Sequence, residues 1–168
     1  MNALIEHALS LVTKLYQVCE EKRLTISTAE SCTGGTVGAL LTHPAGASRY
    51  YMGSIVSYAN EVKKNLLGVK NGTLVSVGAV SEETCGEMAK GAYRALATSL
   101  TVSITGIAGP GGESPEKPQG LVYIATYDGK TLKVSKNFFS GDRQTVRLKT
   151  ACEALEMLIR AAESYRHE

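Results

Sequence analysis

Residues 24–35 read LTISTAESCTGG and combine, around one bend of the chain, the features that decide the fold. The β-branched run at 24–28 predicts a short strand, and a helix-like pattern follows from Gly34 to Thr42. The bend between them carries an acid, two potential nucleophiles and a glycine pair. This bend is therefore a catalytic corner, a phosphate cradle or only a tight turn, and its neighbours must decide between these readings.

The composition limits the class of protein. The chain of 168 residues is long enough for one compact domain with a sizeable core, and we expect a single domain over 1–168. Its net charge of +2, with no basic stripe, argues against a nucleic-acid partner. No apolar run reaches the roughly 18 residues that a membrane helix needs, so no membrane partner is expected either.

The N-terminus and the cysteines indicate the compartment. Glu6 and His7 interrupt the N-terminal apolar pattern, and no basic region with a small-residue cleavage site is present, so we interpret this segment as part of the fold rather than a signal peptide. The four cysteines lie far apart without a C-x-x-C pair, which predicts neither a zinc site nor a disulfide framework. We expect a reduced, cytoplasmic protein.

Helix and strand patterns alternate along the chain. Apolar residues at three- and four-residue spacing predict amphipathic helices over 3–19 and 144–162. Between them we expect strands over 24–28, 54–58, 100–105, 121–127 and 131–135, and helices over 34–42, 61–67 and 82–99. The Asp128-Gly129 pair predicts a hairpin between the last two strands. This order predicts a three-layer α/β/α sandwich around a mixed, mostly parallel sheet with at least one antiparallel strand.

Three unusual segments are expected at one edge of that sheet. Ligands of α/β sheets collect at the carboxyl ends of the parallel strands. The Ser31 bend, the stretch 58–63 and the loop 105–112 all follow predicted parallel strands, so we expect them side by side. Their convergence is the main indication of a site.

Ser31 has two readings. At a strand-to-helix turn, the N–H groups of the helix start could hold an oxyanion or a phosphate, and Gly34 and Gly35 would let a ligand approach closely. Alternatively, Ser31 or Thr33 only caps the helix, and this stretch alone favours capping. The sequence does not match the G-x-S-x-G elbow of serine hydrolases.

A nucleophilic serine needs a base. His7, His43 and His167 all lie outside the three converging segments, so no Ser-His-Asp triad is predicted. Lys63 is the better candidate, because the first turn of a helix and partial burial both lower the pKa of an ammonium group. A lysine taken alone is more often a solvated surface residue, and that reading stays open.

The remaining groups are read as follows. We interpret Cys32 as a packing residue rather than a thiolate nucleophile, and Glu30 as a hydrogen-bonding strut rather than a metal ligand. The glycine-rich stretch 106–112 could bind phosphate or be only a loop. Arg143 and Arg147, four residues apart, could grip a phosphate or carboxylate or form a surface charge cluster.

Taken together, these segments resemble one family. The motifs TAESCTGG, PAGAS, GSIVSYANEVKKNLLGV, GAVSEET, SITGIAGPGGESPEKPQG and GDRQTVR occur in this order and near these spacings in the C-terminal domain of the competence/damage-inducible protein CinA. The resemblance covers residues 11–158 and extends to the stand-alone nicotinamide-nucleotide amidohydrolases of that family. It implies an α/β/α sandwich. CinA proteins often carry a further N-terminal domain, whose activity is not expected in these 168 residues.

The resemblance implies hydrolysis of the carboxamide of nicotinamide mononucleotide (NMN) to nicotinate mononucleotide and ammonia, without metal or cofactor. It assigns Ser31 as the nucleophile, Lys63 as the base and Tyr58 as a residue that orients the lysine or the substrate. The N–H groups of the Cys32–Gly35 bend would hold the oxyanion. The substrate-binding residues expected on this basis are Gly34, Gly35, Ser48, Thr105, Gly106 and Arg147.

For two of these residues the resemblance leaves two roles open. Arg147 would meet the phosphate or hold the site together, and Ser48 would support the site or serve as second-choice nucleophile. The competing functions are a non-catalytic nucleotide-binding or regulatory module and a DNA-associated competence factor, the latter disfavoured by the weak net charge. The expected partner is a small-molecule nucleotide, and the apolar terminal helices suggest a homodimer.

Overall fold

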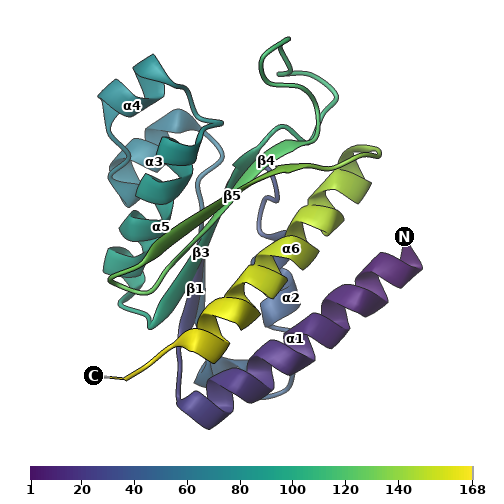
Figure 1. The fold of residues 1–168 in the computed structure, drawn as a ribbon, viewed down its shortest axis with the longest axis vertical. Coiled ribbons are helices and arrows are strands. Elements are labelled where there is room, and N and C mark those ends of the chain that lie inside the picture. The colour runs from purple at the N-terminus through teal and green to yellow at the C-terminus, as the bar shows by residue number, and fades with distance from the viewer. Residues whose placement is uncertain (168) are drawn as a thin grey trace.

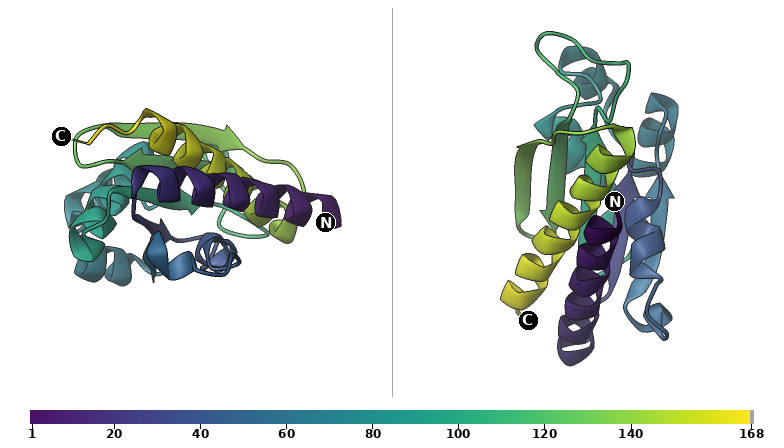
Figure 2. Two further views of the ribbon diagram at one scale, coloured as in Figure 1. Left: turned by 90° about the horizontal axis from the view of Figure 1, so that it is seen from below. Right: turned by 90° about the vertical axis from the view of Figure 1, so that its right-hand side faces the viewer.

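The computed structural model describes residues 1–167 as a five-stranded sheet with helices on both faces (Figures 1 and 2). The elements in chain order are α1 (Asn2–Lys22), β1 (Ile26–Glu30), α2 (Thr36–Leu41), η1 (Ala47–Arg49), β2 (Tyr51–Val56), α3 (Asn60–Leu67), α4 (Asn71–Ser76), α5 (Glu82–Leu96), β3 (Leu100–Gly106), β4 (Leu121–Tyr127), β5 (Leu132–Phe138) and α6 (Arg143–Ser164). No helix within residues 1–167 is both long and apolar enough to cross a membrane.

The sheet is mixed, as predicted. Its strand order is β2-β1-β3-β4-β5; β1 pairs in parallel with β2 and β3, whereas β4 pairs antiparallel with β3 and β5. Four strands therefore run in one direction and β4 alone runs against them. The α/β/α fold class predicted from the alternation of elements is confirmed.

The helices divide between the two faces. α1, α2 and α6 cover one face and α3, α4 and α5 the other, with α1 lying along α6 (Figure 1). The apolar sides of the two terminal helices thus meet each other, in a cluster that includes Val12 and Leu15 of α1 and Leu155 and Leu158 of α6. These apolar sides are buried within the chain and are not left for a subunit interface. The homodimer suggested by the helices stays a prediction.

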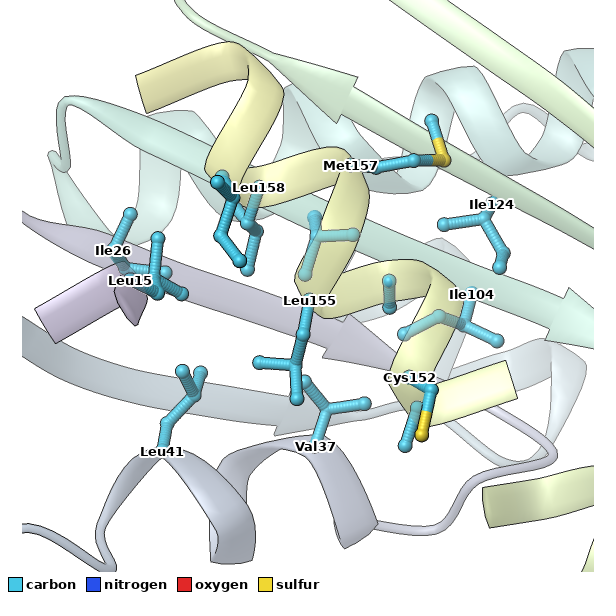
Figure 3. Packing of buried hydrophobic residues seen from close by; sticks show 14 of the residues in the cluster. Leu15, Ile26, Val37, Leu41, Ile104, Ile124, Cys152, Leu155, Met157 and Leu158 are labelled. Carbon is cyan, nitrogen blue, oxygen red and sulfur yellow. The ribbon is translucent and has the colours of Figure 1, made fainter. Parts of the chain in front are cut away.

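β3 alternates between apolar and hydroxyl side chains. In β3, Leu100, Val102 and Ile104 enter the core under α6, where Figure 3 shows Ile104 near Cys152 and Leu155. The intervening hydroxyls lie on the opposite face and are hydrogen-bonded there: Ser103, for example, donates to the carbonyl of Cys85 in α5 at 2.6 Å. Because side chains alternate along a strand, β3 has one apolar face and one face of hydrogen-bonded hydroxyl groups.

The hairpin and most elements agree with the patterns, although several boundaries differ by two or three residues: β5, for example, runs to Phe138 instead of 135. The hairpin turn closes through Asp128, whose carboxylate accepts from Thr131 N at 2.6 Å. β1 extends to Glu30, and β2 begins at Tyr51, because pairing with β1 continues the ladder past Gly53. α4 has no buried residue and so no periodic signal; it is held by Glu87 of α5, which accepts from Lys70 N at 2.8 Å.

The position of α3, which carries Lys63, depends on one glycine of α5. A Cβ atom added to Gly91 would lie 2.0 Å from the carbonyl oxygen of Leu67, so only glycine permits this approach of the two helices. A backbone contact cannot be relieved by a rotamer change, and overpacking of this kind typically costs about 1–3 kcal/mol.

We therefore expect Gly91→Ala to lower the free energy of unfolding by about 1–3 kcal/mol in urea titrations. The matched control is Gly72→Ala in α4, where a Cβ meets nothing within 4 Å. Alanine there should be neutral or stabilising, because glycine has the lower helix propensity. Equal stability of the two variants would contradict this account of the packing.

Candidate active site

The bend after β1 is built around the carboxylate of Glu30, which is fully buried. Its two oxygens accept hydrogen bonds from three backbone N–H groups and two hydroxyls. The donors and distances are Gly35 N (3.0 Å), Val37 N (3.2 Å), Gly38 N (2.8 Å), Thr33 Oγ1 (2.7 Å) and Thr28 Oγ1 (3.1 Å). These N–H groups belong to the start of α2 and have no partner within the helix. Glu30 is thus the strut that the sequence suggested.

The bend turns on Gly34 and Gly35, which have φ angles of +58° and +97°. These left-handed values strain any other residue, whereas the space around both positions is ordinary, with Arg147 Nη2 at 3.5 Å from a Cβ placed on Gly34. Both glycines are therefore required by backbone conformation. Gly35 N is committed to Glu30, and Gly34 N donates to the carbonyl of Ser31 at 2.9 Å.

Strand alternation turns Ser31 to the opposite face from Glu30. Ala29, two residues earlier, packs with Leu67 and Met88 of α3 and α5. Ser31 continues that side, and Lys63 Nζ of α3 lies 3.0 Å from its Oγ. The backbone of Ser31 is fixed by its N–H, which donates to the carbonyl of Ile104 in β3 at 3.0 Å. A buried serine and a buried lysine thus face each other, as expected from the convergence of the two segments.

Lys63 is enclosed by neutral acceptors. Its Nζ donates to the carbonyls of Ser57 (2.6 Å) and Tyr58 (3.1 Å) as well as to Ser31 Oγ, and the residue is only 1% exposed. No carboxylate within residues 1–167 pairs with it. Burial therefore lowers the pKa of Lys63 from its ordinary value of 10.5, and the opposing influence of Cys32 is smaller.

The pair opens into a cavity of about 240 Å³ at the carboxyl edge of the sheet. The Ser31 bend, Tyr58 with Lys63, and the loop 105–112 all line it. The three converging segments are therefore together. Arg143, the first residue of α6, closes another side of this cavity.

Two expected substrate residues serve the walls of this cavity. The Thr105 hydroxyl donates to the carbonyl of Ala79 at 2.7 Å and so ties the end of β3 to the loop before α5. A Cβ on Gly106 would lie 2.7 Å from the Leu121 carbonyl oxygen, so this glycine allows β4 to pair closely with β3. These contacts give Thr105 and Gly106 structural roles in the cavity wall. Their expected role in substrate binding stays a prediction.

Tyr58 contributes at two points. Its backbone carbonyl accepts from Lys63, and its phenol oxygen accepts from Arg143 Nη2 at 3.1 Å. The side chain is 62% exposed and lies along the cavity. Tyr58 thus holds the lysine through its main chain and meets Arg143 through its side chain.

Arg147 does not line the cavity. Its Nη2 donates to the Thr33 carbonyl (2.8 Å) and to Thr36 Oγ1 (3.1 Å), which clamps the bend from behind. Of the two expected roles, holding the site together is the one that its contacts support. Its Nε is buried without a partner within residues 1–167.

Ser48 is not part of this site. It lies exposed in η1, just before β2, and β2 begins beside Ile26 at the start of β1. Because these strands are parallel, Ser48 lies at the amino edge of the sheet and Ser31 at the carboxyl edge. The motif PAGAS placed Ser48 near the site by resemblance alone, and the topology corrects this assignment.

Fewer N–H groups of the bend are free to bind an oxyanion than the sequence suggested. Gly34 N and Gly35 N are occupied, whereas the N–H groups of Cys32 and Thr33 donate to no protein acceptor in the part of the chain that the structure describes. Cys32, which lines the cavity, is the donor adjacent to Ser31. Its thiol is buried, and burial raises its pKa to about 11, which agrees with packing rather than nucleophilic chemistry.

Sequence patterns missed Gly38 and did not distinguish Arg143 from Arg147. Arg143 was paired with Arg147 by spacing, but the helical spacing of four residues does not say which arginine reaches the cavity. Gly38 carried no signal, although a Cβ there would lie 2.4 Å from Ser54 Oγ and would displace the helix start that bonds Glu30. Within residues 1–167, no three His, Cys, Asp or Glu side chains group closely enough to hold a metal ion.

The fold and site define an α/β/α domain with a buried serine–lysine pair at the carboxyl edge of a mixed sheet. The model of the CinA C-terminal domain matches residues 8–162, and the chain belongs to this family. A CinA-like protein of Kosmotoga olearia is 52% identical over 139 residues, which are 82% of this chain and 34% of that protein. The chain thus spans about a third of the length of the curated relatives that it matches.

Solved structures agree in fold. The competence/damage inducible protein CihA of Agrobacterium tumefaciens superposes with a TM-score of 0.91 at 39% identity, covering 94% of this chain and 96% of that one. The competence damage-inducible protein A (ComA) of Klebsiella pneumoniae has a TM-score of 0.91 at 29% identity, covering 95% and 99%. These similarities extend over nearly the whole of each chain.

The role of Glu30 can be tested by Glu30→Gln. The amide keeps the shape but presents an NH₂ group where backbone N–H donors need an acceptor, and an unsatisfied buried donor costs about 1–3 kcal/mol. We expect a loss of that size in urea unfolding, with Glu113→Gln on the exposed loop as the control. A Glu30→Gln protein as stable as the control would show that the carboxylate does not hold the bend.

Proposed function

We propose that this domain hydrolyses the carboxamide of NMN to nicotinate mononucleotide and ammonia, with Ser31 as nucleophile and Lys63 as general base. The observation that carries the proposal is the 3.0 Å contact between Lys63 Nζ and Ser31 Oγ in a buried, cavity-lining pair. The resemblance to nicotinamide-nucleotide amidohydrolases supplies the substrate. The pair supplies the reaction type, because a neutral lysine can activate a serine for acyl transfer.

The hydrogen bonds of Lys63 suit the proton transfer. A neutral amine has two N–H groups and one lone pair. The carbonyls of Ser57 and Tyr58 accept the two N–H bonds, and the lone pair is then left to accept the hydroxyl proton of Ser31. Burial without a counter-ion favours this neutral form.

The acyl-transfer steps use groups of this chain alone. Ser31 Oγ attacks the carboxamide carbon as its proton passes to Lys63, and the N–H of Cys32 is the proposed donor to the oxyanion. When the tetrahedral intermediate collapses, the C–N bond breaks and Lys63 returns the proton to the departing ammonia. Water, deprotonated by Lys63, then attacks the acyl carbon, and cleavage of the ester bond releases nicotinate mononucleotide and restores Ser31.

The first test is the Ser31→Ala variant assayed with NMN for ammonia and nicotinate mononucleotide. We expect kcat to fall at least about a thousandfold, as removal of a catalytic nucleophile does elsewhere, with substrate binding retained. Ser48→Ala is the matched control and should stay within about twofold of the unchanged protein, because Ser48 lies at the other edge of the sheet.

The outcomes separate the competing functions. Release that survives a chelator and disappears in Ser31→Ala supports the metal-independent Ser–Lys mechanism. NMN binding without release would favour a non-catalytic nucleotide-binding module. Loss of activity in Ser48→Ala but not in Ser31→Ala would transfer the nucleophile to Ser48 and overturn the site described above.

The pH dependence follows from Lys63. Protonated lysine cannot accept the Ser31 proton, so kcat/KM for NMN should rise with pH through the pKa of Lys63 and then level off. Because burial lowers that pKa, the midpoint should lie below 10.5. The profile is measured with circular dichroism at each pH to exclude unfolding. A profile that is flat, or that falls as pH rises through neutrality, would rule out Lys63 as the base.

A further inference from the structure

β2 is the less protected of the two edges of the sheet. The strand order ends in β2 on one side and in β5 on the other, and within residues 1–167 no strand pairs with the outer side of either. β5 carries Lys133 and Lys136, charges of the kind that keep a sheet edge from pairing with another chain. β2 reads YMGSIV and contains neither a charged residue nor a proline. An uncharged open edge of this kind is a template for a further strand.

Apolar side chains are exposed along this edge. Met52 and Val56 of β2 are 45% and 44% exposed, and Tyr58, just beyond the strand, is more exposed still. A strand added to the outer side of β2 would remove part of this apolar surface from water, which favours association.

The outer backbone groups of β2 are regularly spaced over its second half. Ser57 N donates to the Glu30 carbonyl of β1 at 2.8 Å, so Ser57 turns its backbone groups inward. Because these directions alternate along a strand, Ser54 and Val56 turn their N–H and C=O groups outward. The register shift of β2 against β1 lies before Gly53, and the pairing from there to Val56 is regular. The open edge therefore presents evenly spaced donors and acceptors.

A second copy of β2 is the occupant that fits this edge. Two identical strands that pair antiparallel about a two-fold axis form a closed dimer, whereas β2 on β5 of another copy would leave one edge of each kind open. Pairing of β5 with itself would bring lysines together, which the uncharged β2 avoids.

The residues that flank β2 are complementary in charge. Arg49 precedes the strand and Glu61 follows it; both are exposed, and each has one ion pair within its own chain. In an antiparallel pair the beginning of each strand lies beside the end of the other. Arg49 of one copy would therefore approach Glu61 of the other at both ends of the interface, which favours this arrangement.

We propose that the chain forms a homodimer in which β2 pairs antiparallel with β2 of a second copy, with Ile55 opposite Ile55. In this register Ser54 of each copy exchanges backbone hydrogen bonds with Val56 of the other, and the sheet continues through both copies. The segment that follows β2 carries the carbonyls that accept from Lys63, so the interface borders the candidate site. The inference does not depend on the proposed reaction.

The edge is tested by Val56→Lys in sedimentation equilibrium at micromolar concentration. We expect the unchanged protein to have twice the mass of one chain and Val56→Lys the mass of one chain, because the variant places like charges within the pairing. The matched control is Phe138→Lys, which replaces an exposed apolar residue of β5 and should remain a dimer. A single-chain mass for the unchanged protein or for the control, or a dimer of Val56→Lys, overturns the inference.

The register is tested by Ile55→Cys. Opposite residues of a non-hydrogen-bonded antiparallel pair have Cα atoms about 4.5 Å apart, which a disulfide can bridge. After oxidation by dissolved oxygen we expect Ile55→Cys to run as a covalent dimer in non-reducing gels. Val134→Cys, in the other edge strand, should run as a single chain, as should the unchanged protein, whose four cysteines are buried.

Circular dichroism confirms that both cysteine variants are folded. A folded Ile55→Cys protein without the cross-link, or an equal cross-link in Val134→Cys, overturns the proposed pairing. If Ile55→Cys does not fold, the masses of the Val56→Lys and Phe138→Lys proteins decide whether β2 forms the interface.

Discussion

The buried carboxylate of Glu30 is the interaction on which the site depends. Three N–H groups at the start of α2 would otherwise lie in the protein interior without acceptors, at a cost of about 1–3 kcal/mol each. Glu30 accepts all three together with the Thr33 hydroxyl, so α2 can begin directly behind the strand that leads to Ser31. The same bonds remove Gly35 N from the set of possible oxyanion donors, and the bond of Gly34 N to the Ser31 carbonyl removes a second one. A helix start that looked like an anion site is therefore occupied by an anion from its own chain.

Lys63 differs from Glu30 in that its buried titratable group is surrounded by neutral acceptors. Among residues 1–167 no carboxylate pairs with its ammonium group, and the acceptors around its Nζ are two carbonyls and a hydroxyl. Burial therefore dominates its titration and lowers the pKa. The one opposing influence, a Cys32 thiolate, is absent at neutral pH, because the pKa of that thiol is raised to about 11. The position of the lysine is set from a distance by the close packing of α3 on α5 at Gly91. The lowered pKa of Lys63 thus follows from its burial in the packed interior.

The sequence predicts the elements well where periodicity and turn chemistry agree, and less well where tertiary contacts decide. The strand 121–127 was predicted together with its hairpin, which the Asp128-Gly129 pair indicated, and the structure has both. α4 could not be predicted, because its start is held by Glu87 from another helix. Ser31 and Lys63 were paired because their segments follow adjacent parallel strands. The direction of Arg147 was not predictable, since spacing along a helix does not fix which of two arginines meets a cavity. Ser48 was placed by a motif, and only the strand topology shows that it lies at the wrong edge.

One geometric rule joins these observations. Successive residues of a strand point to opposite faces, so neighbouring positions in the sequence perform unrelated tasks. Glu30 faces α2 and the apolar core under α6, where it stabilises the bend, whereas Ser31 faces α3 and its lysine. A shift of β1 by one residue would bury the serine under α2 and turn the acid toward Lys63, where it would pair with the ammonium and raise its pKa. The register of β1 between β2 and β3 therefore determines whether Lys63 faces a hydroxyl or a carboxylate. The roles proposed for Lys63 as base and for Ser31 as nucleophile both depend on this register.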